Sequence, residues 1–292
     1  MLNFLHAGIA TVLCMVLLTG CSAPARPALP NEPKLTSREG IVIAGSGVNL
    51  PLIRELAIAY EARRSTEKIK IPDSIGSSGA IKAIMDKGIN LGLISRPLQE
   101  QEKAVGLKQV QYARTAVIIA AHPSVPVDNI SAADLLAIYR GSKRQWPEGK
   151  NIIPHLMYKE DAVNGILADQ IKEFSGVLDE ALRNNYWKIH YNDLSMAGAI
   201  AAIPGSIGFS DSSWSSSSQE KMKVLQLDGV SPTPANILSG EYQLERGMYF
   251  VYKDPLDPRV KDFLDFVFSP EGQQIIKKAQ VIPVPRITDG NH

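Results

Sequence analysis

Two short loops rich in glycine and serine are the residues of this chain best suited to chemistry. They are Gly45-Ser46-Gly47-Val48-Asn49 and Gly76-Ser77-Ser78-Gly79, and each lies between an apolar strand-like run and a helix-like run. A helix N-terminus leaves its first four amides unpaired and carries about half a positive charge, so a glycine-rich entry lets an oxyanion approach closely. Turns between strands and helices also use Gly and Ser for geometry alone. Two such loops in succession favour an anion-binding hypothesis.

The elements that must position these loops alternate in type along the chain. From Ile41 to Ile94, apolar strand-like runs alternate with amphipathic stretches, which predicts an α/β fold with parallel strands and right-handed crossovers. Thr115–Ala121 is a continuous apolar run, typical of a strand buried on both faces. We expect further strands at 152–157, 207–209, 222–227 and 248–252, and helices at 52–64, 80–87, 132–139, 162–173, 178–184, 196–203, 260–268 and from 270 onward.

Two of the expected helices begin with capping residues. Ser131 precedes one helix, with Asp134 three residues on, and Ser269 followed by Pro270 opens another. Serine at the N-cap and proline at the first helical position are both typical of helix starts. Ser212–Ser218 is a polar low-complexity patch, for which we expect a surface loop.

The first residues indicate a secreted protein. Residues 1–20 contain a short apolar run that ends abruptly, as in a signal peptide. Leu18-Thr19-Gly20-Cys21 closes it in the pattern of a bacterial lipobox, which predicts a lipid on Cys21, although residues 1–6 contain no Lys or Arg. Residues 21–37, rich in Pro and Ala, suit a flexible tether. The mature protein is therefore expected on the periplasmic face of a bacterial membrane.

Composition excludes several functional classes. The net charge of +1 and the lack of a long basic block argue against nucleic acid as a partner. Because Cys14 leaves with the signal peptide and Cys21 is lipidated, we expect neither a disulfide nor a thiolate metal site. The five histidines show no helical metal-ligand spacing, and no nucleophile elbow, Walker loop or dinucleotide fingerprint occurs. No cofactor, metal or enzymatic activity is expected.

Six segments, in their order along the mature chain, resemble the phosphate-type periplasmic solute-binding proteins of ABC importers. The resemblance implies a two-lobe type II periplasmic-binding (Venus-flytrap) α/β fold with two crossing hinge strands and a ligand in the cleft. Residues 38–116 plus 245–292 would form lobe one, and residues 117–244 lobe two. The segments that carry the resemblance are 45–51, 76–82, 91–98, 134–141 with Trp146, 203–209 and 266–273.

The resemblance also implies ligand-binding residues in both loops. Ser77 stands where the family has a serine whose hydroxyl and amide hold the anion, and Asn49 replaces the usual threonine of the first loop. A side-chain amide can still donate a hydrogen bond there. The residues expected to bind ligand on this basis are Gly47, Val48, Asn49, Gly76, Ser77, Ser78 and Gly79.

Two family positions differ in this chain. Arg96 stands where phosphate binders have an aspartate that accepts a proton from phosphate. A charge about 4 Å from a ligand charge contributes on the order of 4 kcal/mol at an effective dielectric near 20, so this exchange alters selectivity. Arg96 either faces the cleft, where it favours a fully ionised group, or forms an ion pair with Glu100 or Asp161. The family's third loop, Arg followed by Gly-Ser-Gly-Thr, is replaced by Tyr158–Gly165.

Further residues around that third segment carry alternative interpretations. Lys159 contacts ligand or belongs to a solvated, internally paired turn, and Ser195 faces the cleft or simply caps a helix. Ala162 and Val163, in place of polar donors, indicate a more apolar cleft wall, which Tyr158 and Trp187 could line if they are not core residues.

We therefore expect a monomeric, lipid-anchored solute-binding protein that closes on a small oxyanion and delivers it to an ABC permease. A larger or more apolar ligand, suggested by the altered third loop, is one alternative. A lipoprotein that presents ligand to a membrane sensor is another. Fold resemblance alone does not name the ligand.

Overall fold

The structure is a computed structural model that describes residues 40–64, 67–215 and 221–286. The expected signal peptide, the lipidation at Cys21 and the tether up to residue 37 lie outside these residues. Among the described residues, no helix has both the length and the apolar character that crossing a membrane requires.

The strands form one connected sheet in the order β2-β1-β3-β10-β4-β8-β6-β7, with β11 and β9 paired to β4 and β5 paired to β9. β1 pairs in parallel with both β2 and β3, as the sequence pattern predicts. The strands are β1 (Ile41–Gly45), β2 (Ile69–Lys70), β3 (Leu91–Ile94), β4 (Leu107–Ala121), β5 (Asn129–Ile130), β6 (Ile153–Met157), β7 (Lys188–His190), β8 (Ser206–Asp211), β9 (Lys223–Leu227), β10 (Glu245–Lys253) and β11 (Ile282–Pro283).

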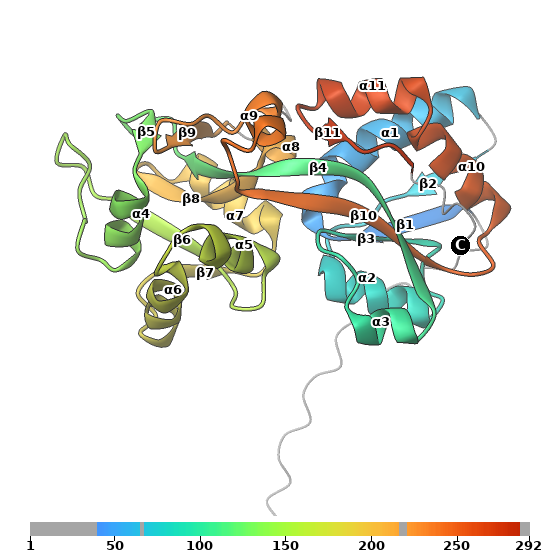
Figure 1. Ribbon diagram of the computed structural model, residues 1–292, viewed down its shortest axis with the longest axis horizontal. Coiled ribbons are helices and arrows are strands. Elements are labelled where there is room, and N and C mark those ends of the chain that lie inside the picture. Colours follow the sequence, from blue (N-terminus) through green and yellow to red (C-terminus); the bar gives the residue numbers. More distant parts are fainter. Residues whose placement is uncertain (1–39, 65–66, 216–220, 287–292) are drawn as a thin grey trace, which may run out of the picture. The chain divides into compact units, whose positions relative to one another are not determined.

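The long strand β4 joins the two halves of the sheet. Up to Ala116 it pairs antiparallel with β10, and from Val117 onward it pairs with β8 and β9. Figure 1 shows β4 and β10 side by side along their paired lengths. Val117–Ala121 are completely buried, which explains the unbroken apolar run seen in the sequence.

The helices follow the expected pattern, with capping at several starts. The Ser131 hydroxyl accepts a hydrogen bond from the Asp134 amide at 3.0 Å, and Ser269 accepts one from Gly272 at 3.3 Å. The helices are η2 (Gly47–Asn49), α1 (Leu50–Arg63), α2 (Gly76–Met85), α3 (Glu100–Ala104), α4 (Ala132–Tyr139), α5 (Ala162–Gln170), α6 (Phe174–Arg183), α7 (Asp193–Ala202), α8 (Ser212–Ser215), α9 (Pro234–Ser239), α10 (Pro258–Val267) and α11 (Pro270–Lys278).

The buried apolar side chains form separate cores on either side of the pairing change in β4. One core joins α1, α10 and α11 to β1, β3 and β10, with the Tyr112 ring stacked on Phe250 at 4.2 Å between centroids. A smaller cluster packs α2 on the opposite side of β1 and β3. Another core joins α4, α5, α6 and α7 to β6, β8 and the end of β4. We call the first two clusters with their elements the first lobe, and the third with its elements the second lobe.

Three expectations for local structure are wrong. The helix expected over 162–173 ends at Gln170, because Ile171 is extended, and Glu173, with a left-handed φ of 72°, is the N-cap residue of the next helix, α6. The helix expected from Ala80 begins at Gly76, so the second glycine loop is itself a first helical turn. The expected surface loop at Ser212 starts as helix α8, in which Ser212 and Ser213 are buried. Residues 216–218 of that patch lie outside the described residues.

Candidate functional site

The two glycine loops meet at the carboxyl ends of β1 and β3. Gly45 pairs with Leu93, and a Cβ on Gly45 would lie 2.1 Å from the Leu93 carbonyl oxygen, so only glycine fits. The Ser74 hydroxyl, which precedes the second loop, donates to the Gly45 carbonyl at 3.1 Å. Ligands of open α/β sheets bind beyond the carboxyl ends of the strands, which is where both loops lie.

Three serine side chains connect the loops. The Ser46 hydroxyl donates to the Ser95 hydroxyl at 3.1 Å, and the Ser95 amide donates to the Ser77 hydroxyl at 3.3 Å. Ser77 acts only as an acceptor in this chain of bonds, so its own hydroxyl hydrogen has no acceptor among the described residues. Ser77 is half-buried. It therefore holds a donor ready for a ligand.

The N-terminus of α2 has free donors of its own. Its N-cap is Ile75, which supplies no side-chain hydrogen bond, and Gly76 donates to Ser74 Oγ at 3.3 Å. In the part of the chain that the structure describes, the amides of Ser77 and Ser78 have no hydrogen-bond acceptor. Unpaired amides at the start of a ten-residue helix attract an anion through both hydrogen bonding and the helix dipole.

Asn49, the last residue of the first loop, is completely buried. Its Oδ1 accepts a hydrogen bond of 2.6 Å from the Tyr112 hydroxyl, while its Nδ2 has no partner among the described residues. A buried donor without a partner costs free energy, typically about 1–3 kcal/mol. Asn49 therefore keeps one donor that a bound acceptor or a water molecule would satisfy.

Arg96 forms an ion pair, but neither expected partner is involved. Its two terminal nitrogens each donate at 2.8 Å to the Glu102 carboxylate, a fork-like pair. This pair raises the pKa of Arg96 and lowers that of Glu102. Burial is the main cause of the raised pKa of Tyr158 in the second lobe, and the Arg96 charge opposes it. Arg96 thus lies within electrostatic range of the second lobe while held by its own lobe.

Lys159 and Ser195 have partners within the second lobe. The Lys159 ammonium lies 3.3 Å from the Asp179 carboxylate, and its side chain is 68% exposed. The Ser195 hydroxyl bonds to His190 Nδ1 at 2.8 Å. The N-cap of α7 is Asn192, whose side chain accepts from the Ser195 amide at 2.8 Å. All of these bonds lie within the second lobe, and none of them joins Lys159 or Ser195 to the two glycine loops.

The N-terminus of α5 stands where the related family has its third loop, and the Asp161 side chain caps it. Asp161 Oδ1 accepts from the Val163 amide at 2.9 Å, so a protein carboxylate holds the donor that an anion would use. Val163 is 1% exposed and belongs to the core of the second lobe. It therefore does not form the apolar ligand wall suggested by the sequence.

A buried arginine on β10 is the main charged feature that the sequence did not indicate. Arg246 is 6% exposed, and its guanidinium donates to both oxygens of Asp211, at 2.8 and 2.5 Å. Asp161 and Asp193 also lie near it, each 3.9 Å away. Arg246 lies in β10, Asp211 in β8 and Asp193 in α7, and Asp161 is the N-cap residue of α5, so no local pattern joins them in the sequence.

Asp193 also brings the two lobes into contact. A Cβ on Gly47 would lie 2.5 Å from Asp193 Oδ2, so the carboxylate of the second lobe sits against the first glycine loop. Burial is the main cause that raises the pKa of Asp193 to about 7, and Asp161 and Asp211 add to it while Arg246 opposes it. The Arg246 fork is already used by Asp211, so Asp193 receives only part of its attraction.

The lobes therefore offer opposite chemistry where they meet. The first lobe presents hydrogen-bond donors at the start of α2 and at Asn49, next to Gly47. The second lobe presents the carboxylates of Asp161 and Asp193. This arrangement can hold an anion on the first lobe and make its affinity depend on the charge of Asp193. Among the described residues, no group of three His, Cys, Asp or Glu side chains could hold a metal ion.

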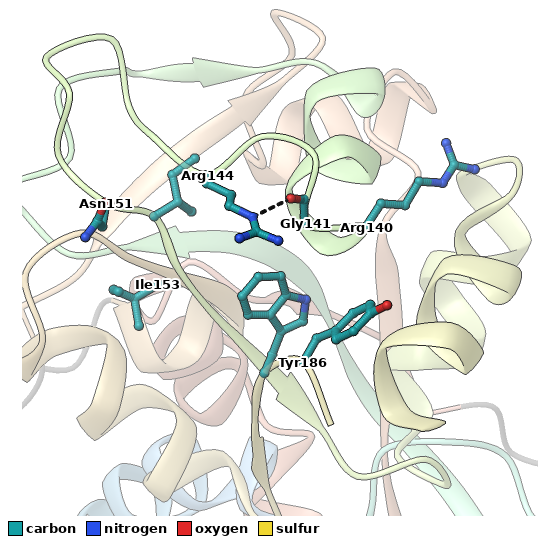
Figure 2. A pocket seen from close by; sticks show the side chains of 8 residues that line it. Arg140, Gly141, Arg144, Asn151, Ile153 and Tyr186 are labelled. Carbon is teal, nitrogen blue, oxygen red and sulfur yellow. Dashed lines mark hydrogen bonds between the residues drawn. The ribbon is translucent and has the colours of Figure 1, made fainter. Parts of the chain in front are cut away.

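A pocket elsewhere in the second lobe contains Trp187, which the sequence placed in the cleft wall or the core. Its volume is about 510 Å³, and its walls come from the turn after α4, the residues at the start of β6, and the two residues before β7. Figure 2 shows the Arg144 guanidinium directed into the pocket, on the side where Tyr186 lies, whereas Arg140 extends away. None of the ligand-binding residues expected from the sequence lines it.

Fold and site together define a two-lobe α/β protein of the periplasmic-binding type. The sequence model for the PBP superfamily domain matches residues 30–271, and the chain belongs to this superfamily.

Curated relatives are similar over most of their length. The phosphate-binding protein PstS of Bacillus subtilis is 26% identical over 286 residues, which is 92% of this chain and 90% of the relative. The protein of the same name from Borreliella burgdorferi is 24% identical over 252 residues, covering 82% of this chain and 88% of the relative.

Solved structures agree on the fold. One from Clostridium perfringens, described as a phosphate ABC transporter substrate-binding protein with bound phosphate, is 26% identical with a TM-score of 0.72, covering 84% of this chain and 99% of that one. The Azotobacter vinelandii periplasmic molybdate-binding protein, 14% identical with a TM-score of 0.60, shares the fold, with 84% of this chain and 99% of that one covered.

Proposed function

We propose that this protein binds a small oxyanion of the phosphate type between its lobes and delivers it to an ABC permease. Residues 38–116 with 245–292 act as one lobe and residues 117–244 as the other, with β4 and β10 as the hinge strands. The protein works as a binding protein and not as an enzyme, in keeping with the names of its relatives.

The observation that carries this proposal is the set of free donors at the start of α2. The amides of Ser77 and Ser78 and the Ser77 hydroxyl have no acceptors in the described part of the chain. The first loop adds the buried Nδ2 of Asn49, which has no hydrogen-bond partner among the described residues. The similarity to a structure with bound phosphate, at 26% identity, supports phosphate as the first ligand to test.

Arg96 contributes positive charge beside this site. Three of its five N–H donors are engaged, two with Glu102 and one with the Pro97 carbonyl, which leaves two for a ligand. Lys159 and Ser195 would reach a ligand only if their bonds to Asp179 and His190 were exchanged. We therefore propose that the ligand binds mainly to Gly47, Val48, Asn49 and Gly76–Gly79, and that Arg96 adds a secondary contact.

Transport requires a change that the permease can detect. A ligand that contacts both lobes stabilises the closed arrangement by its differential affinity for that state. A lipid on Cys21 would keep the monomeric protein at the periplasmic side of a membrane, near the permease. Presentation to a membrane sensor would use the same closure, and uptake of labelled phosphate with and without the protein separates the two roles.

Calorimetric titration and thermal unfolding with phosphate test the proposal. Phosphate at a hundred times its dissociation constant should add about 2.7 kcal/mol to the free energy of unfolding. Ser77→Ala removes one hydroxyl donor to a charged ligand, so binding should weaken by roughly tenfold or more. Ser239→Ala is the matched control, because Ser239 is exposed and its hydroxyl donates only to the Asn236 carbonyl.

Equal titrations for both variants and the wild type would remove Ser77 from the site. Complete absence of binding to phosphate, sulfate and molybdate, with binding of a bulky apolar compound instead, would contradict the oxyanion proposal. In that case, the larger or more apolar ligand considered from the sequence becomes the explanation.

A further inference from the structure

We propose that the pocket in the second lobe is a separate binding site for a small molecule that carries a carboxylate on a flat aromatic body. Its volume of about 510 Å³ lies in the range of small-molecule sites, roughly 300–1,000 Å³. The proposal concerns a place apart from the glycine loops and does not depend on what binds there.

The charged side chains of the pocket determine the sign of the charge that its ligand carries. Its lining residues include Arg140 and Arg144 and no acidic side chain. Arg140 is neutralised, because its guanidinium bonds to Glu173 at 2.6 Å. Arg144 has no carboxylate within ion-pair distance in the described part of the chain, and its Nε donates to the Gly141 carbonyl at 2.8 Å. The terminal nitrogens of Arg144 are thus left for an external anion, and a carboxylate fits their fork.

The aromatic wall determines the shape of the ligand. The Trp187 indole donates to the Tyr139 carbonyl at 2.9 Å, which fixes the ring. The Tyr186 ring meets it edge-on, at 6.2 Å between centroids, and Tyr186 is 44% exposed. Figure 2 shows the Tyr186 ring on the side of the pocket toward which Arg144 points. A flat aromatic group can stack there while its carboxylate reaches Arg144.

The pocket is held in shape before any ligand arrives. The Arg144 carbonyl accepts a hydrogen bond from the Ile152 amide at 2.9 Å, which closes the turn formed by the residues between them. Within that turn, the Trp146 indole donates to the Gly205 carbonyl at 3.1 Å. Gly141, with a left-handed φ of 76° that favours glycine, forms the turn between Trp187 and Arg144, both of which lie beside it. Such preorganisation lowers the entropy cost of binding.

Titration of the purified protein with naphthoate, neutral naphthamide and acetate tests the proposal. Naphthoate should bind saturably, naphthamide roughly tenfold more weakly because the charge contact is lost, and acetate more weakly still because the stacking is lost. Arg144→Gln should weaken naphthoate binding by about tenfold. Arg183→Gln is the matched control, since Arg183 also donates its Nε to a backbone carbonyl, that of Asp179, and lies outside this pocket.

Two further measurements keep the outcome clear. Nuclear Overhauser effects between naphthoate and the Trp187 ring protons should appear in NMR spectra of the wild-type protein. The test therefore holds even if Arg144→Gln folds poorly. Saturating phosphate should leave naphthoate affinity unchanged. The proposal is overturned if naphthoate does not saturate, if naphthamide binds equally well, if Arg144→Gln and Arg183→Gln behave alike, or if phosphate displaces naphthoate.

Discussion

Asp193→Asn should stabilise the protein strongly at alkaline pH. The Asp193 side chain is 16% exposed and lies 3.9 Å from Arg246, whose fork is occupied by Asp211. The loss of hydration therefore destabilises the charged form of Asp193 more than the attraction to Arg246 stabilises it. As a result, the pKa of Asp193 is raised from 3.8 to about 7. Asparagine resembles the neutral acid in size and shape and removes this cost.

The size and sign of the effect follow from linkage. The folded state binds the Asp193 proton more tightly than the unfolded state does, so the free energy of unfolding falls as pH rises from about 4 to 7. A shift of about three pKa units corresponds to about 4 kcal/mol. Asp193→Asn should therefore gain about 4 kcal/mol over the wild type at pH 8, and less than about 1 kcal/mol at pH 4.

Urea unfolding of both proteins at pH 4 and pH 8 measures this difference. For a chain of this size, about 4 kcal/mol at the transition corresponds to roughly 8–16 °C in Tm, so calorimetry provides a second readout. Asp179→Asn is the control, because Asp179 is 48% exposed in its ion pair with Lys159 and should change stability by less than about 1 kcal/mol. Destabilisation of Asp193→Asn at pH 8 would show that Asp193 and Arg246 form a favourable pair, and would refute the reasoning.

Three other predictions test the buried polar groups. Burial lowers the pKa of His155 from 6.5 to about 4, so the unfolded state binds its proton more tightly. His155 therefore removes about 3 kcal/mol of stability as pH falls from 6.5 to 4, and His155→Gln should show a smaller loss in urea titrations over this range. Arg246→Met leaves the Asp211 carboxylate buried and unpaired and should cost about 3–5 kcal/mol in urea unfolding at pH 8, whereas a cost below about 1 kcal/mol would contradict the assigned ion pair. Tyr112→Phe removes the one hydrogen-bond donor that Asn49 Oδ1 has among the described residues and should lower the free energy of unfolding by about 1–3 kcal/mol in urea titrations, and an unchanged midpoint would contradict this.

The fold could be predicted from the sequence to a large extent because its signals are local. The Ser131 and Ser269 hydroxyls cap their helices by accepting hydrogen bonds from the backbone amides three positions on. The apolar run at Thr115–Ala121 lies in a buried strand, although β4 begins earlier, at Leu107. The segment from Leu107 to Arg114 mixes polar and apolar residues, and its strand character depends on pairing with the distant β10.

The charged part of the candidate site could not be predicted because its partners are far apart in sequence. Arg246 meets Asp211 from a different strand, and Asp193 reaches Gly47 from the other lobe. No spacing rule links such residues, since tertiary packing alone brings them together. Arg96 shows the same limit at short range, because Glu102 rather than Glu100 pairs with it once α3 turns Glu102 toward the strand end.

Backbone amide chemical shifts of the protein during a phosphate titration test the central claim most directly, because they locate the bound anion as well as detect it. We predict saturable changes that are largest at the amides of Ser77 and Ser78 and extend to Gly47 and Asn49. Absence of any saturable change, or changes confined to the pocket around Trp187, would contradict an oxyanion site at the glycine loops.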